Sequence, residues 1–493
     1  MSNRLIVGLD LGTSGLKAVA INDAGEIVAR ASSKYPTARP ELGASEQNPS
    51  DWISSVKEIV AQIKNSTGDQ EWKVIGLSGM LPTLVTVDGE GVPVGAAITW
   101  EDGRAEAEGE ALRNGIGADY IFKITGQWVD GRYLLPMLAR LCKVEPERIA
   151  RSTRLLGAKD YLFFYLTGKY LTDPSTATGF GCFDIHTGEW DFEIIAKHLT
   201  TSKLLELPEI ASSRTTSSLS TRAADALGLQ GDIAVCVGAA DSVLGAIGMG
   251  VDSPGDIAYV GGTSTIILGI SKTPIHDEQH RYLITPMVDS DSWGLEMDLL
   301  STGSAIRWLA NLLNIKFEES LIALAISADD SRLPTFLPYL APGEQGALWD
   351  PTLTGTITGL DVGHTSAEIA RSLIDGILVE SARCIQTLHE IGLDNGAIRV
   401  SGGSASDPWF RQQLANAVQR TIEANISQEP DRSALGAAIV AAQSIGLNIS
   451  HALMKLESTF PHVGSDAYWI QRKNINHTER MKWKNDNRPP RSY

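Results

Sequence analysis

The sequence lacks most features of a secreted, membrane or nucleic-acid-binding protein. Its four cysteines include no CxxC pair, which argues against a disulfide framework or a structural zinc site. No apolar run reaches the roughly 18 residues of a membrane span, and the N-terminal residues carry no secretory signature. The net charge of −17 disfavours a general affinity for nucleic acid or anionic membranes. We therefore expect a cytoplasmic protein. The cysteines are Cys142, Cys182, Cys236 and Cys384.

The 493 residues are enough for two large domains, and the sequence pattern repeats. Strand-like segments at Arg4–Asp10 and Leu16–Ile21 flank a tight turn, and helical spacing follows at Pro49–Lys64. After residue 240 the strand–turn–strand pattern returns at Asp256–Val260 and Thr265–Ile270. This alternation predicts α/β layers in two domains that arose by duplication.

We expect the first domain to span about residues 1–245 and the second about 246–450, followed by a C-terminal extension at 451–493. The end of the extension, Gln471–Tyr493, has seven basic residues, two acidic residues and few apolar ones. This composition predicts a solvated, frayed tail, and an arm that binds a partner or nucleic acid is the less favoured interpretation.

The first hairpin combines groups that suit a magnesium-bound phosphate. Asp10 ends a strand, so its carboxylate faces out of the sheet edge. The glycine-lined turn after it offers backbone N–H groups, the hydroxyls of Thr13 and Ser14, and the ammonium of Lys17. Mg²⁺ prefers oxygen ligands and keeps several waters, so it fits between a carboxylate and a phosphate. The motif is not a Walker A loop, because the chain has no GxxxxGK[ST]. A plain hairpin with a capping aspartate is the alternative.

Three later segments extend this interpretation. A second turn with Gly262 and Thr263 could clamp a polyphosphate opposite the first. Asp241 follows an apolar strand, where α/β folds bind ligands, and would suit a general base in phosphoryl transfer. A helix N-cap is an equally good interpretation of Asp241. The small residues Gly402 and Gly403 would let a base or ribose approach the backbone.

These motifs, in this order, resemble those of the FGGY carbohydrate kinases, in the superfamily of actin, Hsp70 and hexokinase. Residues 10–17 (DLGTSGLK) resemble the first phosphate loop of the family, and residues 255–271 (GDIAYVGGTSTIILGIS) resemble the second. Residues 398–416 (IRVSGGSASDPWFRQQLAN) resemble its adenosine motif. Residues 100–104 (WEDGR) and 336–346 (FLPYLAPGEQG) are similar to xylulokinases. The resemblance implies an α/β fold of two ribonuclease-H-like domains with an interdomain cleft, and ATP and Mg²⁺ as cofactors.

The resemblance also implies a role for each matching residue. Asp241 takes the position of the catalytic base beside the sugar hydroxyl, and Asp10 that of the carboxylate near the metal ion and γ-phosphate. The ATP-binding positions are Thr13, Ser14, Lys17, Gly262, Thr263, Gly402 and Gly403. The positions expected near the sugar are Met80, Leu81, Trp100, Asp102 and Arg104.

The implied activity is transfer of the ATP γ-phosphoryl group to a small sugar, such as the ketopentose xylulose. One departure bears on the sugar. Xylulokinases carry Gln-Met-His-Gly where this chain has Met80-Leu81-Pro82-Thr83, so Pro82 replaces a histidine that touches the sugar. Loss of a hydrogen-bonding group should alter sugar choice, which leaves ribulose, L-xylulose and erythritol open. A nucleotide-dependent binding protein of the actin/Hsp70 type, a weakened regulatory homologue and a homodimer are also compatible with the sequence.

Overall fold

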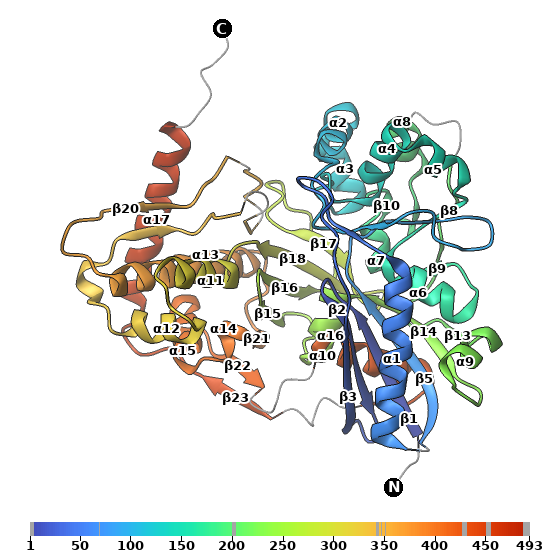
Figure 1. Ribbon diagram of the computed structural model, residues 1–493. Helices are drawn as coiled ribbons and strands as arrows, with labels where there is room; N and C mark the ends of the chain where they lie inside the picture. Colours follow the sequence, from blue (N-terminus) through green and yellow to red (C-terminus); the bar gives the residue numbers. More distant parts are fainter. Residues whose placement is uncertain are drawn as a thin grey trace.

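The computed structural model describes residues 4–68, 70–199, 204–341, 345–346, 348–350, 352–425, 431–449 and 455–486. Two mixed β-sheets form the centres of two lobes (Figure 1). In spatial order the first sheet contains β13 (Thr216–Ser218), β14 (Ala234–Ala240), β5 (Glu71–Gly79), β1 (Arg4–Leu11), β2 (Gly15–Ile21) and β3 (Ile27–Lys34). The second contains β17 (Leu283–Pro286), β18 (Trp293–Leu299), β16 (Thr265–Ser271), β15 (Ile257–Gly261), β21 (Ile398–Gly402), β22 (Ile422–Asn425) and β23 (Leu456–Thr459).

The two sheets share one topology. In the first, β1, β2 and β3 form an antiparallel meander, β5 runs parallel to β1, and β14 runs parallel to β5. In the second, β15, β16 and β18 form the meander, β21 runs parallel to β15, and β22 runs parallel to β21. The repeated hairpins predicted from the sequence therefore occupy equivalent places in two α/β domains.

Two small-residue helices, α10 (Asp241–Gly248) and α16 (Arg432–Ser444), lie between the sheets (Figure 1). They cross so closely that a Cβ on Gly436 would overlap the carbonyl oxygen of Leu244. Although α16 lies in the chain between β22 and β23 of the second sheet, it packs on β1, β2 and β5 of the first. Both helices thus join the two lobes into one body around their shared core. The boundary expected at residue 245 falls inside α10 and stays a prediction.

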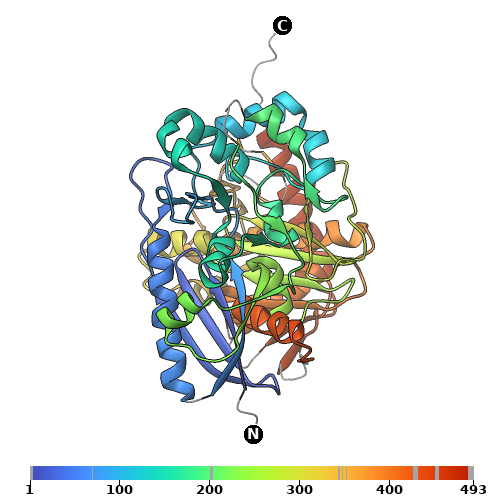
Figure 2. The same ribbon diagram turned by 90° about the vertical axis from the view of Figure 1, so that its right-hand side faces the viewer.

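The other face of the first sheet is covered by α1 (Pro49–Thr67), α6 (Ala158–Thr167) and α9 (Thr221–Leu227). Asn48 caps α1 by accepting a hydrogen bond from the Ser50 N–H, and Trp52, Val56 and Ile59 are buried on the sequence-predicted apolar face. A group of further helices stands above this sheet (Figure 2): α2 (Glu106–Ile116), α3 (Ala118–Thr125), α4 (Leu134–Val144), α5 (Pro146–Arg151), α7 (Pro174–Thr178) and α8 (Phe192–His198).

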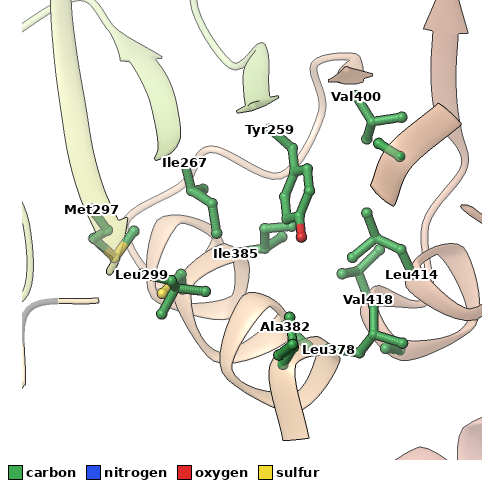
Figure 3. Packing of buried hydrophobic residues seen from close by; sticks show 14 of the residues in the cluster. Tyr259, Ile267, Met297, Leu299, Leu378, Ala382, Ile385, Val400, Leu414 and Val418 are labelled. Atoms are coloured by element: carbon green, nitrogen blue, oxygen red, sulfur yellow. The ribbon is translucent and has the colours of Figure 1, made fainter. Parts of the chain in front are cut away.

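The long helix α13 (Ser366–Glu390) covers the outer face of the second sheet and is buried on most of its sides. Thr365 and Glu368 form a capping box at its start. Its buried side chains Leu378, Ala382 and Ile385 face the sheet (Figure 3). The neighbouring helices are α11 (Gly303–Leu312), α12 (Glu318–Ile326), α14 (Gly403–Ser406), α15 (Pro408–Val418) and the 3₁₀ turn Asp330–Arg332. Two-stranded pairs complete the fold: β4 (Glu46–Gln47) with β7 (Ala97–Ile98), β6 (Val85–Val87) with β8 (Arg154–Leu156), β9 (Leu171–Thr172) with β12 (Glu209–Ile210), β10 (Phe183–Asp184) with β11 (Glu189–Trp190), and β19 (Thr335–Leu337) with β20 (Thr356–Thr358).

The prediction of a frayed basic tail is wrong as far as residue 486. Residues Asp466–Asp486 form helix α17, which packs on α13. Arg472 pairs with Asp375 at 3.5 Å and Arg480 pairs with Glu380 at 3.3 Å, and both arginines are buried. The local charge density suggested solvation because the compensating carboxylates lie about a hundred residues away in the sequence. The remainder of the predicted tail lies outside the described residues.

None of the helices in the described part of the chain is both long and apolar enough to span a bilayer.

Candidate active site

Asp10 lies at the carboxyl end of β1, beside the equivalent ends of two neighbouring strands. The register pairs Asp10 with Ser78 of β5, and Ser78 in turn with Ala239 of β14. Ser78 Oγ donates to Asp10 Oδ1 over 2.7 Å. Burial raises the pKa of the Asp10 carboxyl above its ordinary value, and the Ser78 hydrogen bond opposes that shift. The structure therefore places Asp10 at the sheet edge that the sequence predicts.

Asp241 reaches the same edge through an irregularity in β14. The pairing of β14 with β5 shifts register between Cys236 and Ala239. Gly238 sits in this bulge with φ +73°, and a Cβ there would overlap the Leu77 carbonyl oxygen. The strand then ends and α10 begins at Asp241.

The environment of Asp241 favours its neutral form. Its Oδ1 accepts a hydrogen bond from the Ser242 N–H at 2.9 Å. Burial and the nearby carboxylates of Asp10 and Glu296 raise the pKa of Asp241 to about 8. Such a pKa close to neutrality is common among groups that exchange protons during catalysis, although structural clusters also produce it.

Asp10 and Asp241 share one pocket, with a volume of about 380 Å³, between the two lobes. Its floor on the side of the second sheet is apolar. The lining residues are Asp10, Lys17, Asp241, Ser242, Gly245, Ala258, Val260, Ile266, Leu268, Asp431, Arg432 and Ser433. The two carboxylates predicted from distant motifs thus face the same interlobe space.

The turn after β1, which the sequence predicts to bind phosphate, is held in place by polar side chains. Gln47 Nε2 donates to the Thr13 carbonyl oxygen over 2.7 Å, and Trp100 Nε1 donates to Thr13 Oγ1 over 3.0 Å. Because Thr13 Oγ1 acts as an acceptor here, its own O–H remains able to donate to an anion. Ser14 is exposed at the tip of the turn, and Lys17 Nζ pairs with Asp431 over 2.9 Å. Trp100 therefore supports the phosphate loop and does not line the shared pocket.

The second loop is supported by the start of α11. Ser304 donates to the Thr263 carbonyl oxygen through its N–H and its hydroxyl, each over 3.0 Å. Gly262 and Thr263 themselves are exposed. Gly261 at the base of this loop lies in register with Gly402 of β21. The second loop and the Gly402–Gly403 turn are thus neighbours, as binding of one nucleotide by both would require.

The residues expected near the sugar form a more closed arrangement than the sequence suggests. Asp102 is buried and accepts from the Ser45 N–H and from the Arg104 guanidinium. Arg104 also pairs with Glu41 and Glu46, so its donors already have acidic partners. This network ties two loops of the first lobe together.

Met80 and Leu81 follow β5 directly. Met80 is buried and its N–H donates to the Leu11 carbonyl oxygen over 2.9 Å. Leu81 is half-buried and packs against the core around α10 and α16. Like Asp102 and Arg104, these two residues do not line the pocket that holds Asp10 and Asp241.

Sequence reasoning missed two acidic residues on β18. Ser242 Oγ donates to Glu296 Oε2 over 3.1 Å, and burial raises the pKa of Glu296 to about 7. Burial also raises the pKa of Asp298 to about 6, against the opposing effects of Arg132 and Ser264. The missed signal is that both acids sit two residues apart on one face of an otherwise apolar strand.

The donor set near Asp10 fits a hard cation that keeps most of its waters. Within the described residues there is no group of three or more His, Cys, Asp or Glu side chains that could enclose a metal ion. Mg²⁺ does not need such a cage, since it binds through one or two carboxylates together with substrate phosphates. Asp10 with its neighbour Asp241 offers carboxylates of this kind, and their repulsion would be relieved by a divalent cation.

The family models that match this two-lobed fold are those of sugar kinases. Residues 5–248 match the N-terminal domain of the FGGY family of carbohydrate kinases, and residues 257–445 match its C-terminal domain. The chain belongs to this family.

Individual relatives differ in their named sugar. The chain is 28% identical to the xylulose kinase of Staphylococcus xylosus over 444 residues, covering 89% of this chain and 90% of that protein. It is 26% identical to the gluconokinase of Bacillus subtilis over 461 residues, covering 90% and 88%. A crystal structure of ligand-bound xylulose kinase from Lactobacillus acidophilus superposes with a TM-score of 0.89 at 26% identity, covering 97% of this chain and 98% of that one.

Proposed function

We propose that the protein transfers the γ-phosphoryl group of Mg-ATP to a hydroxyl of a small neutral sugar, a ketopentose such as xylulose. The observation that carries this proposal is the placement of Asp241 beside Asp10 in the pocket between the lobes. Asp241 positions the acceptor hydroxyl and takes its proton as the oxygen attacks phosphorus. Its raised pKa suits this exchange, because a base with a pKa near the working pH can accept and then release a proton.

The other site residues divide into nucleotide and metal functions. Thr13, Ser14 and the backbone of the first loop donate to the phosphates from one lobe, and Gly262 and Thr263 donate from the other. Gly402 and Gly403 leave room for the adenosine. Asp10 binds Mg²⁺ directly or through water, and the cation supplies charge neutralisation for the phosphates. We assign the sugar to residues 1–245 and most of the nucleotide to 246–450.

The charges around Asp241 favour a neutral acceptor over an acidic one. Asp10 and Glu296 already raise the pKa of Asp241 by repulsion, and a further anion placed beside Asp241 would add to that repulsion. A hexonate such as gluconate carries a carboxylate, whereas a ketopentose or a tetritol does not. We therefore propose the type of sugar named for the xylulose kinases among the relatives. Other ketoses and polyols are the second candidates, because Pro82 replaces the histidine that touches the sugar in xylulokinases.

The test is acceptor-dependent ADP formation with a panel of pentoses, tetritols and hexonates. We expect a neutral ketopentose to give the highest kcat/KM and gluconate to give at least a tenfold lower value. Preference for gluconate would contradict the neutral-acceptor assignment. ADP release that no sugar stimulates would instead favour a nucleotide-dependent binding protein.

A further inference from the structure

A buried ion cluster lies behind the strand that leads to Asp241. Lys159, at the start of α6, is 1% exposed, and Asp160 and Asp173 are fully buried. Lys159 Nζ lies 3.1 Å from Asp160 Oδ1 and 3.1 Å from Asp173 Oδ1. Burial lowers the pKa of Lys159, but the two carboxylates outweigh this effect and raise it, so the ammonium stays charged.

This cluster holds the bulge in β14 and the residue that follows the bulge just before Asp241. On one side, Lys159 Nζ donates to the carbonyl oxygen of Val237 over 3.1 Å. On the other side, the N–H of Ala240 donates to Ser175 Oγ over 2.9 Å, and that hydroxyl donates to Asp173 Oδ2. Val237 lies within the irregular segment, and Ala240 follows it and immediately precedes Asp241.

Asp173 is the common anchor of the two contacts. Its Oδ1 accepts from Lys159 and from Thr176 Oγ1 (2.6 Å), and its Oδ2 accepts from the N–H and hydroxyl of Ser175. One carboxylate therefore fixes an ammonium on the upstream side of the bulge and a hydroxyl on the downstream side.

We propose that Lys159, Asp173 and Ser175 are positioning residues, which set the location of the Asp241 carboxylate by clamping the backbone from Val237 to Ala240. The inference rests on the proposed role of Asp241 as base. None of the three lines the shared pocket, so they act through the strand and not on the substrate.

General energetics favour this role over a purely stabilising one. A buried ion cluster gains little net stability, because desolvation of the charges offsets their attraction. Such a cluster can have a large effect on rate by fixing the geometry of a reacting group. A displacement of about 1 Å at such a group can lower the rate on the order of 10²-fold. A bulge that frees backbone groups next to a catalytic side chain needs partners that define its shape.

The test compares two small changes on the same turn. Ser175→Ala removes the acceptor for the Ala240 N–H, whereas the control Thr176→Val removes a hydroxyl that donates to the same Asp173 carboxylate and not to the β14 backbone. We expect Ser175→Ala to lower kcat about 10- to 100-fold, with the KM for ATP within about twofold. We expect Thr176→Val to retain kcat within about threefold. Rates are expressed per nucleotide-binding site, so that loss of folded protein does not count as loss of turnover.

A pH profile separates positioning from stability. If Ser175→Ala moves Asp241 relative to its acidic neighbours, the midpoint of the kcat/KM profile shifts together with the fall in kcat. Asp173→Asn, which removes one charge and keeps the shape, provides a second variant if Ser175→Ala folds poorly, and we expect the same pattern.

The outcomes distinguish the positioning role from the proposed function. Normal kcat and an unshifted profile in folded Ser175→Ala and Asp173→Asn, with inactive Asp241→Asn, would overturn the positioning role and leave the proposed function intact. An equal loss of kcat in Thr176→Val would also overturn it, because a hydroxyl that does not bind the β14 backbone would then matter as much as the one that binds the Ala240 N–H. Full turnover in Asp241→Asn would overturn both.

Discussion

Ser242 Oγ donates a hydrogen bond to Glu296 Oε2 over 3.1 Å, and this contact joins the first turn of α10 to the second sheet. It holds Glu296 next to Asp241, whose pKa is raised by burial, by Asp10 and by Glu296. A residue of the second lobe thereby tunes the carboxylate that we assign as base.

The pH–rate profile should follow the protonation of Asp241. A base must be deprotonated to accept a proton, so kcat/KM for the sugar should rise with pH, pass its midpoint near pH 8 and level off above about pH 9. Glu296→Gln removes one negative neighbour and should move the midpoint to lower pH. Steady-state kinetics in constant-ionic-strength buffers measure both profiles. A midpoint that stays in place or moves upward in Glu296→Gln would contradict the assignment.

The same shift predicts how stability depends on pH. The pKa of Asp241 rises from 3.8 to about 8 on folding, so its contribution to stability is present below about pH 4 and is lost as the pH rises through about 8. The side chain introduced by Asp241→Asn does not titrate. The unfolding free energy of the variant, relative to that of the wild type, should therefore increase by a few kcal/mol, to order of magnitude, between about pH 4 and pH 8. Urea unfolding at several pH values measures the difference. The exposed Asp225→Asn serves as the control, and a difference that is independent of pH in Asp241→Asn would refute the prediction.

Gly402 and its neighbour Gly403 provide a matched pair of variants at the turn that we assign to the adenosine. Gly402 has φ +102° and a Cβ there would overlap the Gly261 carbonyl oxygen, whereas a Cβ on Gly403 would meet nothing within 4 Å. Gly402→Ala should lower the unfolding free energy by about 2 kcal/mol or more and weaken ATP binding through the displaced second loop. Gly403→Ala should leave stability within about 0.5–1 kcal/mol of the wild type. Thermal unfolding and ATP titration measure these effects, and equal stabilities for the two variants would count against the geometry.

Trp100 should affect the nucleotide more than the sugar. Trp100→Phe keeps an aromatic ring but loses the hydrogen bond to Thr13 Oγ1. A lost hydrogen bond of about 1 kcal/mol corresponds to roughly a fivefold rise in the KM for ATP, with the KM for the sugar little changed. Initial rates with each substrate varied in turn test this expectation. A rise confined to the KM for the sugar would contradict this expectation and indicate that Trp100 contacts the sugar.

Local patterns predicted the elements whose signals are local. The hairpins around Gly12 and Gly262 and the helix α1 around Trp52 follow from turn residues and periodicity. Asp10 and Asp241 were found because each follows an apolar strand at the carboxyl edge of a sheet.

The remaining features depend on contacts between distant segments. The burial of Arg472 and Arg480 requires the carboxylates of α13. Helix α16 packs on the first sheet, although its neighbours in the sequence belong to the second. Nothing in the sequence around Lys159 indicates that it is buried between Asp173 and the bulge of β14. The residue pattern of one segment cannot predict contacts of this kind between distant segments.

The turnover of Asp241→Asn, compared with its affinity for ATP, tests the assignment of the base without an intermediate step. We expect kcat with the best sugar to fall by about 10²–10⁴-fold, because the acceptor hydroxyl loses its base. The dissociation constant for ATP, measured by calorimetry, should stay within about threefold of the wild-type value. Near-normal turnover by a folded, ATP-binding Asp241→Asn variant would show that Asp241 is not the base.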